Sequence, residues 1–465
     1  MYKYPKILEI PLFTGPAKLK ETIRIPGSKS ISNRVLLIAA LAKGSTKIEG
    51  LLSSVDTEKM ADALGNLGVE FKGDRPFTGA FEVVGCGGKF KACPEELYIE
   101  NAGTAMRFLT AALTLGEGGY TLTGNAAMQK RPIKDLTEAL KQIDIKITDA
   151  GGCPPVQIEA HGFAGGRIQI PGDKSSQYIS ALMIVAPYAQ SDTIIEITGH
   201  LVSVTYVEMT KEIMEAFGAT VGWDYKNQTI TIKAGTGYKA LSSYAVEADA
   251  SSASYYFGLA AISSDVVYFD DAFEFTSQGD AGLYNILRSM SRVLQVVKGP
   301  NGTGAMFQRK FDGQLKAVEV DMNSMSDVAP TLAVVALFAD GTTKIRNVGN
   351  MRIKECDRIQ AVYNELTKLG ASIWGLVGES NEFRIADPDG TMPPEVDGLA
   401  ILGDPSCESF HGADLDTYDD HRMAMAFSLA GTKIKSVRIK DTDCVTKTFP
   451  NYWEVLKKFL PTLEV

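Results

Sequence analysis

The sequence predicts an α/β protein of two similar domains, each built from three repeats of a βαβ-type unit. A chain of 465 residues exceeds the size at which one hydrophobic core stops growing, so two domains are expected. One order of elements recurs: a short apolar strand, a polar loop, an apolar helix, a break rich in Gly, Asp or Ser, and another strand. In addition, IRIPGSKS at residues 23–30 has a near copy in IQIPGDKS at residues 168–175. Together these observations indicate a duplicated α/β architecture.

The first helix of each unit is apolar on all sides, which predicts that it is buried. These helices read RVLLIAALAKG, RFLTAALTLGEGG, YISALMIVAPYAQSD, YYFGLAAISSD, TLAVVALFADG and RMAMAFSLAG. We expect the strands before them to begin near Ile23, Leu97, Ile168, Val246, Val318 and Leu415.

The second helix of each unit has apolar residues at helical spacing with charges between them, the pattern of a half-exposed helix. The six segments read TEKMADALGNLGVEF, IKDLTEALKQIDIKI, YVEMTKEIMEAFGATV, GLYNILRSMSRVLQVV, RIQAVYNELTKLGASI and YWEVLKKFL. The symmetry of the repeats alone would place the two halves of the chain at residues 23–245 and 246–465.

Composition excludes several classes of protein. Hydrophobic residues make up 45% and charged residues 22%, and no apolar run approaches the roughly 18 residues of a membrane span. A net charge of −9 argues against nonspecific nucleic-acid binding. The six cysteines form no CxxC pair and only four histidines occur, so we expect reduced thiols and no metal site. The N-terminal segment MYKYPKILEI lacks the pattern of a signal or transit peptide, which predicts a cytoplasmic protein, or a plastid protein whose transit peptide has been removed.

Polar loops with many cations precede the helices. Backbone N–H groups at a helix start form a ready site for anions, so repeated loops of this kind can converge on one anionic ligand. If they meet at the domain interface, their cations would focus positive potential on small, multiply charged anions. The cations of these loops are Lys29, Arg34, Arg131, Lys354, Arg358, Arg422 and Lys447.

A plain structural interpretation exists for each of these side chains. A single Lys or Arg can be a solvated loop charge, and a Ser before a helix usually serves as an N-cap. Recurrence at the same position in several units favours ligand binding, and one Ser can both cap a helix and contact a ligand.

Eight motifs then identify a family. In chain order they read PGSKSISNR, NAGTAMR, KRPI, SSQY, DASSAS, RIKECDRI, YDDHRMAM and KTFPNYW. From about Ile23 to the C-terminus the chain resembles the 5-enolpyruvylshikimate-3-phosphate synthase (3-phosphoshikimate 1-carboxyvinyltransferase) family. This family transfers the enolpyruvyl group of phosphoenolpyruvate to the 5-hydroxyl of shikimate 3-phosphate and releases phosphate, in the shikimate pathway to chorismate and the aromatic amino acids.

The resemblance implies an enolpyruvyl transferase fold, with two domains of three βαβαββ units each and the active site in the cleft between them. In this family one domain is inserted into the other, so residues 1–26 plus 247–465 would form domain 1 and residues 27–246 domain 2. It also implies the two small-molecule substrates as ligands, no metal or organic cofactor, no nucleic-acid or membrane partner, and a monomer.

Site residues are carried over motif by motif. The residues expected to bind shikimate 3-phosphate are Lys29, Ser30, Arg34, Ser175, Ser176, Ser203, Asp327, Asn350 and Lys354. Those expected to bind phosphoenolpyruvate are Lys29, Gly103, Arg131, Gln177, Arg358, Arg422 and Lys447. These residue types suit the task, because Arg presents a planar fork to carboxylate and phosphate and Gly lets the backbone approach a ligand closely.

The reaction needs a base for the 5-hydroxyl proton and an acid for the methylene carbon. Asp327 and Glu355 match the family's catalytic carboxylates, and Lys29 is a third candidate for proton transfer. We assign Asp327 as base and Glu355 as the better candidate for acid. The structural alternative for both is an N-cap or an ion pair with Arg358 or Lys354. His421 either orients its neighbours or has a structural role.

Three positions depart from the family pattern. Phe108 stands where proline is usual, at the expected start of the helix beside Gly103, and predicts weaker inhibition by glyphosate, which targets this family. Pro330 lies close to Asp327, where the first turn of a helix tolerates it. Lys174 precedes the two serines of the SSQY motif, as Lys29 precedes Ser30 in the duplicated turn; we expect it either to strengthen binding of the 3-phosphate or to point to solvent.

Two other functions remain open at this stage. The related UDP-N-acetylglucosamine enolpyruvyl transferases usually have Lys-Asn where this chain has Lys29-Ser30, and they carry a cysteine in a mobile loop; the SSQY and KECDR motifs favour shikimate 3-phosphate. A noncatalytic anion-binding relative is the second alternative. The presence of Lys29, Asp327, Glu355 and Lys447 argues against it.

Overall fold

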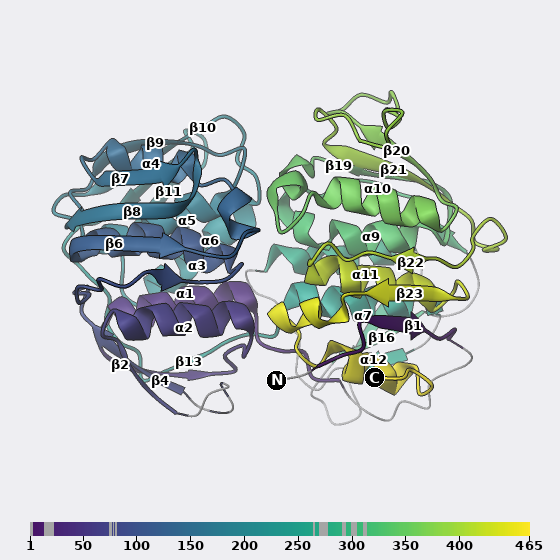
Figure 1. Cartoon of the computed structure of the whole chain (residues 1–465), viewed down its shortest axis with the longest axis horizontal. Helices are drawn as coiled ribbons and strands as arrows, with labels where there is room; N and C mark the ends of the chain where they lie inside the picture. The colour runs from purple at the N-terminus through teal and green to yellow at the C-terminus, as the bar shows by residue number, and fades with distance from the viewer. Residues whose placement is uncertain are drawn as a thin grey trace. The chain divides into compact units, whose positions relative to one another are not determined.

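A computed structural model of the chain describes residues 3–13, 23–73, 77, 79, 81–263, 266–268, 278–290, 294–298, 305–309 and 314–465 (Figure 1). The chain forms two compact units. We call Gly27–Glu247 the inserted unit, and Met1–Pro26 together with Ala248–Val465 the terminal unit. The described residues form six small sheets, three in each unit.

The inserted unit consists of three four-stranded sheets, with strand orders β13-β2-β4-β3, β5-β6-β8-β7 and β11-β12-β10-β9. Its strands are β2 (Lys43–Glu49), β3 (Glu70–Lys72), β4 (Phe81–Cys86), β5 (Leu97–Tyr98), β6 (Glu117–Thr123), β7 (Lys146–Ala150), β8 (Cys153–His161), β9 (Gly166–Pro171), β10 (Thr193–Thr198), β11 (Val221–Asp224), β12 (Thr229–Ile232) and β13 (Ser243–Ala245). Its α-helices are α1 (Lys29–Leu41), α2 (Val55–Asn66), α3 (Gly103–Ala112), α4 (Lys134–Lys141), α5 (Ser176–Val185) and α6 (Val204–Ala216), and short 3₁₀ turns occur at η1 (Leu113–Leu115), η2 (Met128–Lys130) and η3 (Ala186–Tyr188).

The terminal unit repeats this plan with the sheets β14-β16-β15, β1-β23-β22 and β17-β19-β21-β20, with β18 also paired to β19. Its strands are β1 (Ile7–Ile10), β14 (Val266–Tyr268), β15 (Leu294–Lys298), β16 (Ala305–Arg309), β17 (Leu315–Lys316), β18 (Glu319–Asp321), β19 (Ala339–Arg346), β20 (Ser372–Leu376), β21 (Gly398–Gly403), β22 (Asp414–Leu415) and β23 (Val437–Lys440). Its helices are α7 (Ala250–Ser263), α8 (Leu283–Met290), α9 (Ala329–Ala336), α10 (Arg358–Lys368), α11 (His421–Gly431) and α12 (Tyr452–Phe459), and its 3₁₀ segments are η4 (Gly279–Gly282), η5 (Asn323–Val328), η6 (Gly349–Ile353) and η7 (Thr442–Lys447).

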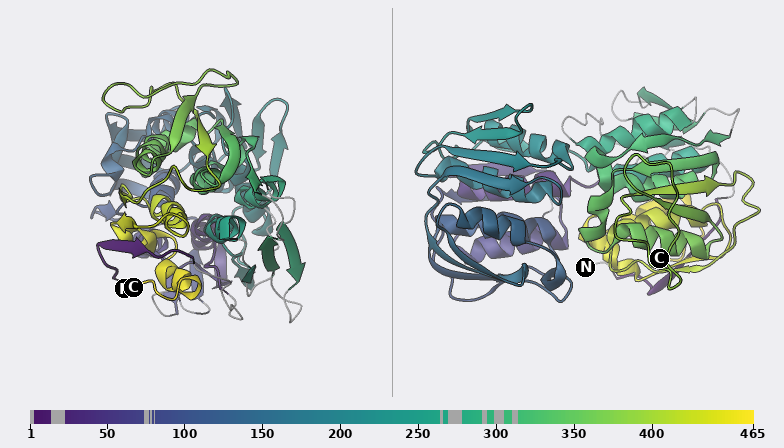
Figure 2. Two further views of the ribbon diagram at one scale, coloured as in Figure 1. Left: turned by 90° about the vertical axis from the view of Figure 1, so that its right-hand side faces the viewer. Right: turned by 90° about the horizontal axis from the view of Figure 1, so that it is seen from above.

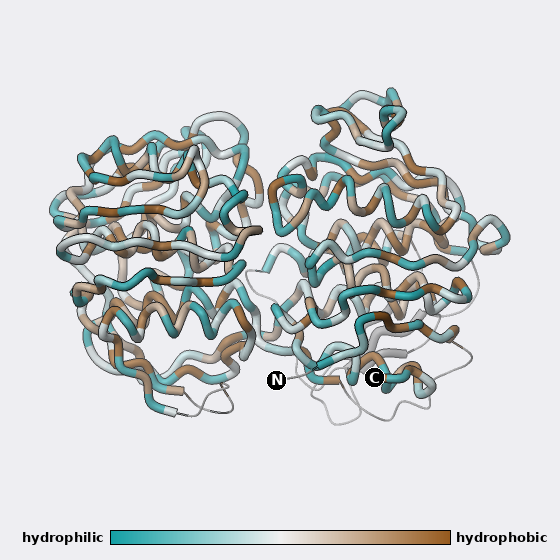
Figure 3. Tube along the Cα trace, viewed as in Figure 1, coloured by the Kyte–Doolittle hydropathy of each residue, from teal (hydrophilic) through white to brown (hydrophobic). Residues whose placement is uncertain are grey.

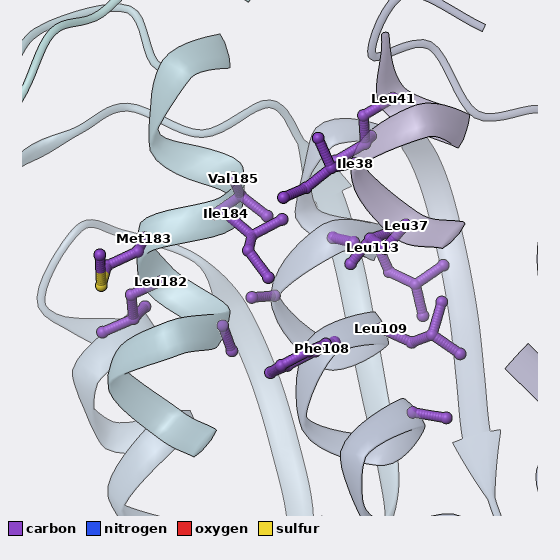
Figure 4. Packing of buried hydrophobic residues seen from close by; sticks show 14 of the residues in the cluster. Leu37, Ile38, Leu41, Phe108, Leu109, Leu113, Leu182, Met183, Ile184 and Val185 are labelled. Carbon is purple, nitrogen blue, oxygen red and sulfur yellow. The ribbon is translucent and has the colours of Figure 1, made fainter. Parts of the chain in front are cut away.

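The first helices are buried, as their apolar composition predicts. In the inserted unit α1, α3 and α5 pack together, and their leucine, isoleucine, valine and phenylalanine side chains form one core (Figure 4). The views in Figure 2 show the helices of this unit lying between its strands. In the terminal unit α7, α9 and α11 are buried in the same way. The start of each buried helix therefore has a fixed position on a well-packed scaffold.

The second helices have apolar residues on one side and polar residues on the other, and the colouring of Figure 3 shows both kinds mixed along α10. The segment GLYNILRSMSRVLQVV is an exception to the predicted pattern. Its helix α8 ends at Met290, and Leu294–Lys298 forms β15 instead, antiparallel to β16. The two adjacent valines in LQVV favour a strand because they are β-branched, and pairing with β16 decides the outcome.

Parallel strand pairs flank most buried helices: β5 with β6 around α3, β9 with β10 around α5, β18 with β19 around α9, and β22 with β23 around α11. For α1 the expected strand near Ile23 is wrong. The parallel partner of β2 is β13, which pairs Ser243 with Lys47. Ile23 is buried in the core of the terminal unit. The last strand of the inserted unit thus completes the sheet of its first repeat, an arrangement that local sequence patterns do not show.

None of the helices in the described ranges is both long and apolar enough for a membrane crossing. All six cysteines carry free thiols. In the part of the chain that the structure describes, no group of three or more His, Cys, Asp or Glu side chains has an arrangement that could hold a metal ion.

Candidate active site

The duplicated turn places Lys29 at the first residue of α1. The hydroxyl of Ser28 caps this helix and accepts the N–H of Ile31 at 3.4 Å. The ammonium group of Lys29 lies 3.7 Å from a carboxylate oxygen of Asp56, near the start of α2. Both side chains are largely buried, so the pair has a defined orientation. Asp56 was not identified from the sequence, although it directly precedes the helical segment predicted to begin at Thr57.

Arg34, one turn further along α1, is buried without a carboxylate partner among the described residues. Its Nε donates to Thr210 Oγ1 at 2.7 Å, and one terminal nitrogen donates to the Ser30 carbonyl at 2.9 Å. The other terminal nitrogen donates to Ser180 Oγ at 3.3 Å and to the Tyr206 carbonyl at 3.1 Å. Burial lowers the pKa of Arg34 to about 10, against a smaller opposing effect of Tyr206. A buried cation with only neutral partners is suited to receiving an anion.

Two aromatic rings flank this guanidinium. Its central carbon lies 5.1 Å from the ring centre of Phe108 and 5.9 Å from that of Tyr206. Phe108 is fully buried and lies inside α3, which begins at Gly103 and not near Arg107 as expected. The prediction that Phe108 lies at a helix start is therefore wrong, because α3 already includes Gly103, Thr104 and Ala105. Its expected effect on glyphosate inhibition stays a prediction.

Gly103 and Arg131 are in close contact. A Cβ atom at Gly103 would come within 2.7 to 2.9 Å of the guanidinium atoms of Arg131. Arg131 is buried and donates to Asn101 Oδ1 at 3.1 Å. Arg107, a residue of the NAGTAMR motif to which no role was assigned, bridges the carbonyls of Gly103 (3.1 Å) and Pro132 (2.9 Å). The absence of a side chain at Gly103 thus leaves room for the guanidinium.

The second copy of the turn lies at the start of α5. Ser175 is the N-cap and accepts the Gln177 N–H at 3.3 Å, and Gln177 Nε2 lies 3.3 Å from Thr104 Oγ1 at the start of α3. Ser176 is buried in the first turn of α5, and Ser203 precedes α6 in a left-handed conformation.

Lys174 has a carboxylate partner within the inserted unit. Its ammonium group pairs with Asp135 at 3.1 Å, and its side chain is 50% exposed. The hydrogen bond to Asp135 raises the pKa of Lys174 despite partial burial. Of the two alternatives stated for Lys174, this half-exposed ion pair lies closer to the second, a side chain that points to solvent.

In the terminal unit, Arg358 contacts three carboxylates. Its Nε donates to Asp420 Oδ2 at 2.7 Å, and its terminal nitrogens donate to Asp327 at 3.0 Å and to Glu355 at 2.8 Å. Its side chain is only 1% exposed. Burial would lower the pKa of Arg358, but Asp420, Glu355 and Asp327 together raise it above its usual range. Asp420, which also caps α11, belongs to a quoted motif but was not assigned a role.

Asp327 contacts three of the cations that the sequence assigns to ligand binding. Besides Arg358, its carboxylate contacts Arg422 at 2.8 Å and Lys354 at 3.3 Å. Although burial acts to raise the pKa of Asp327, Arg422, Lys354 and Arg358 hold it well below its usual range. Pro330 enters the first turn of α9, as expected, directly after the η5 segment that carries Asp327.

Glu355 contacts two cations, Arg358 and Lys447. One oxygen pairs with Arg358 and the other lies 3.4 Å from the ammonium group of Lys447. The ion-pair alternative stated for Asp327 and Glu355 therefore describes their geometry here. Asn350 is buried in η6, and His421 is fully buried with Nδ1 3.6 Å from Asp420.

Comparison with known proteins assigns the chain to a family. The family model of EPSP synthase (3-phosphoshikimate 1-carboxyvinyltransferase) matches residues 13–456. The 3-phosphoshikimate 1-carboxyvinyltransferase of Sulfurovum sp. (strain NBC37-1) is 44% identical over 438 residues, which cover 94% of this chain and 95% of that protein. The chloroplastic 3-phosphoshikimate 1-carboxyvinyltransferase of Brassica napus is 43% identical over 446 residues, covering 94% of this chain and 82% of that protein. The chain belongs to the EPSP synthase family.

Solved structures agree with this assignment. The EPSP synthase of Acinetobacter baumannii superposes with a TM-score of 0.75 and 25% identity, covering 98% of this chain and 99% of that chain. The enolpyruvyl transferase fold predicted from the motifs is confirmed. Of the two acceptor alternatives, the family match supports the shikimate enzyme over the UDP-N-acetylglucosamine enzyme.

Proposed function

We propose that the chain transfers the enolpyruvyl group of phosphoenolpyruvate to the 5-hydroxyl of shikimate 3-phosphate, and that the clusters of both units act on this one pair of substrates. The observation that carries the proposal is the partly buried Asp327 carboxylate held by three cations. The three cations around Asp327 provide the positive charge needed for a substrate that carries both a carboxylate and a phosphate.

The substrate contacts follow the two clusters. Shikimate 3-phosphate binds the start of α1 and α5 and the region of Asp327, through Lys29, Ser30, Arg34, Ser175, Ser176, Ser203, Asp327, Asn350 and Lys354. Phosphoenolpyruvate binds Lys29, Gly103, Arg131, Gln177, Arg358, Arg422 and Lys447. Burial of Arg34 and Arg131 supports these assignments, because a buried guanidinium binds an anion with little competition from water.

Asp327 removes the proton of the 5-hydroxyl group while the oxygen of that hydroxyl attacks the central carbon of phosphoenolpyruvate. The methylene carbon takes a proton from the protonated Glu355, which gives the tetrahedral intermediate. The Glu355 carboxylate then removes a proton from the new methyl group as phosphate leaves, and the proton held by Asp327 leaves with the phosphate. In the free protein Arg422 and Arg358 lower the basicity of Asp327. Phosphoenolpyruvate competes for the same guanidinium groups, so its binding raises the basicity of Asp327 when the acceptor hydroxyl is present.

The proposal also covers the domain division, the oligomeric state and the location of the protein. The inserted and terminal units correspond to the two domains expected from the resemblance. The chain acts as a monomer, as the resemblance to the family implies. Its location is the cytoplasm, or the plastid if a transit peptide was removed; the Brassica napus relative is named as chloroplastic.

Phosphate release from phosphoenolpyruvate tests the function directly. We expect release with shikimate 3-phosphate as acceptor and none with UDP-N-acetylglucosamine. Release with the nucleotide sugar alone would transfer the chain to the other acceptor class. Absence of release with both acceptors, together with tight binding of shikimate 3-phosphate in a titration, would identify a noncatalytic relative.

A further inference from the structure

Two residues with left-handed backbone stand directly before Asp420. Tyr418 has a φ of 57° and Asp419 a φ of 54°. Left-handed geometry is unfavourable for residues that carry a Cβ atom, and two in succession persist only where surrounding contacts impose them. The segment that delivers Asp420 to the cluster is therefore held in place by something outside itself.

Glu365 on α10 provides that contact. Its side chain is fully buried. One carboxylate oxygen accepts the hydroxyl of Tyr418 at 2.5 Å, and the other accepts the backbone N–H of Asp416 at 2.9 Å. The ammonium group of Lys368 lies 2.7 and 2.9 Å from the two oxygens and neutralises the buried charge. Glu365 thus holds the chain on both sides of Thr417.

The far end of the same segment holds the guanidinium group of Arg358 and the first turn of α11, which carries Arg422. The Asp420 N–H donates to the Thr417 carbonyl at 2.8 Å. The Asp420 carboxylate accepts Arg358 Nε at 2.7 Å and the backbone N–H of Arg422 at 2.9 Å. Arg358 and Glu365 both belong to α10, two turns apart. The helix and the loop are therefore tied together at two points.

We propose that the hydrogen bond between Tyr418 and Glu365 is a remote brace that fixes Asp420, and through it the guanidinium group of Arg358 and the helix start from which Arg422 projects, the two arginines that bind phosphoenolpyruvate. Tyr418 and Glu365 are positioning residues, since neither belongs to the set of substrate contacts. The inference rests on the proposed function only in assigning phosphoenolpyruvate to Arg358 and Arg422.

The test is Tyr418→Phe, which removes the hydroxyl and keeps the ring. Tyr418 is 39% exposed as a residue, so the substitution leaves the hydrophobic core unchanged. Tyr225→Phe is the matched control, because Tyr225 Oη also bonds a glutamate, Glu208, at 3.2 Å, but lies in the inserted unit. Circular dichroism and the thermal midpoint establish that both variants fold.

We expect Tyr418→Phe to raise the KM for phosphoenolpyruvate about tenfold, because the charge-assisted hydrogen bond that positions Asp420 is lost. The KM for shikimate 3-phosphate should change less than about twofold. The control should change neither constant. A purely structural role would lower the active fraction and hence kcat, with both KM values unchanged; that result, or no change at all, would overturn the proposal.

Calorimetric titration with phosphoenolpyruvate alone gives the same comparison without turnover, because the acceptor is absent. A tenfold weaker affinity in Tyr418→Phe supports the brace, and equal affinities reject it. An inactive wild-type protein would contradict the proposed function, whereas an active one with an unaltered Tyr418→Phe variant contradicts only the brace.

Discussion

Arg34 in the inserted unit and Arg358 in the terminal unit are both almost completely buried, yet their partners differ in kind. Arg34 contacts two hydroxyls and two backbone carbonyls and lies between aromatic rings. Arg358 contacts three carboxylates. Desolvation lowers the pKa of the first and is overcome by negative charge for the second.

This difference separates two ways of building an anion site. The terminal unit neutralises its buried charges internally, so the arrangement is complete before a substrate arrives. The inserted unit keeps a desolvated cation whose counter-charge must come from a ligand. Binding of the anionic substrate then supplies both affinity and electrostatic stabilisation to the inserted unit.

The largest expected effect concerns the carboxylate that the terminal unit holds ready. Asp327→Asn keeps the shape of the side chain but removes the base, so kcat should fall by roughly 10²- to 10⁴-fold. Steady-state phosphate release measures this. Asp340→Asn, which changes an exposed aspartate paired with Lys316, is the control and should retain wild-type kcat. A kcat within threefold of wild type for Asp327→Asn would assign the base to another group.

A second substitution tests the space that the inserted unit reserves for Arg131. Gly103→Ala places a methyl group against the guanidinium, which must move. We expect the KM for phosphoenolpyruvate to rise by about tenfold (~1.4 kcal/mol) and the KM for shikimate 3-phosphate to stay nearly constant. Gly119→Ala is the control, because a Cβ there meets nothing within 4 Å. Equal rises in both constants would show a general distortion of α3.

The aromatic platform beneath Arg34 predicts a smaller effect. Phe108→Leu keeps an apolar side chain of similar size and removes a cation–π contact of about 0.5–1 kcal/mol. The KM for shikimate 3-phosphate should rise about two- to fivefold. Phe163→Leu, a buried phenylalanine elsewhere in the same core, controls for the loss of packing. The interpretation fails if both substitutions have the same effect on this KM.

Lys174 should show the smallest effect. Its charge is already paired with Asp135 and half exposed, so its field at any bound phosphate is weak. Lys174→Ala should change the KM for shikimate 3-phosphate by less than about twofold, even at low salt. A larger rise at low salt that disappears at moderate salt would restore this lysine to the binding site.

Local motifs predicted much of the candidate site because each one begins a helix. A polar loop before an apolar helix identified Lys29, Arg34 and the Ser175 turn, and the repeat order identified the buried helices. Contacts between distant segments were not predictable in this way. Asp56 and Asp420 act through partners on other elements, and nothing in their neighbours specifies those partners.

The same limit applies to the fold. Strand β13 is separated from its partner β2 by almost the whole inserted unit, so no local pattern links them. The strand β15 shows the opposite case, in which residues that resemble the end of an amphipathic helix pair with β16 instead. In both cases a long-range pairing outweighs the local pattern.

The contrast between the two arginines is tested most directly by unfolding. Arg358→Met leaves the buried Asp420 carboxylate and the partly buried Asp327 and Glu355 without their shared cation and should cost about 3–5 kcal/mol. Arg34→Met should cost less than about 1 kcal/mol, because Thr210 Oγ1 still lies 2.8 Å from both Ser180 Oγ and the Tyr206 carbonyl, which therefore keep a hydrogen-bond partner. Urea unfolding of both variants, with and without shikimate 3-phosphate, gives the comparison. The account predicts that Arg34→Met keeps its stability but is no longer stabilised by this substrate; a loss of stability as large as that of Arg358→Met would contradict it.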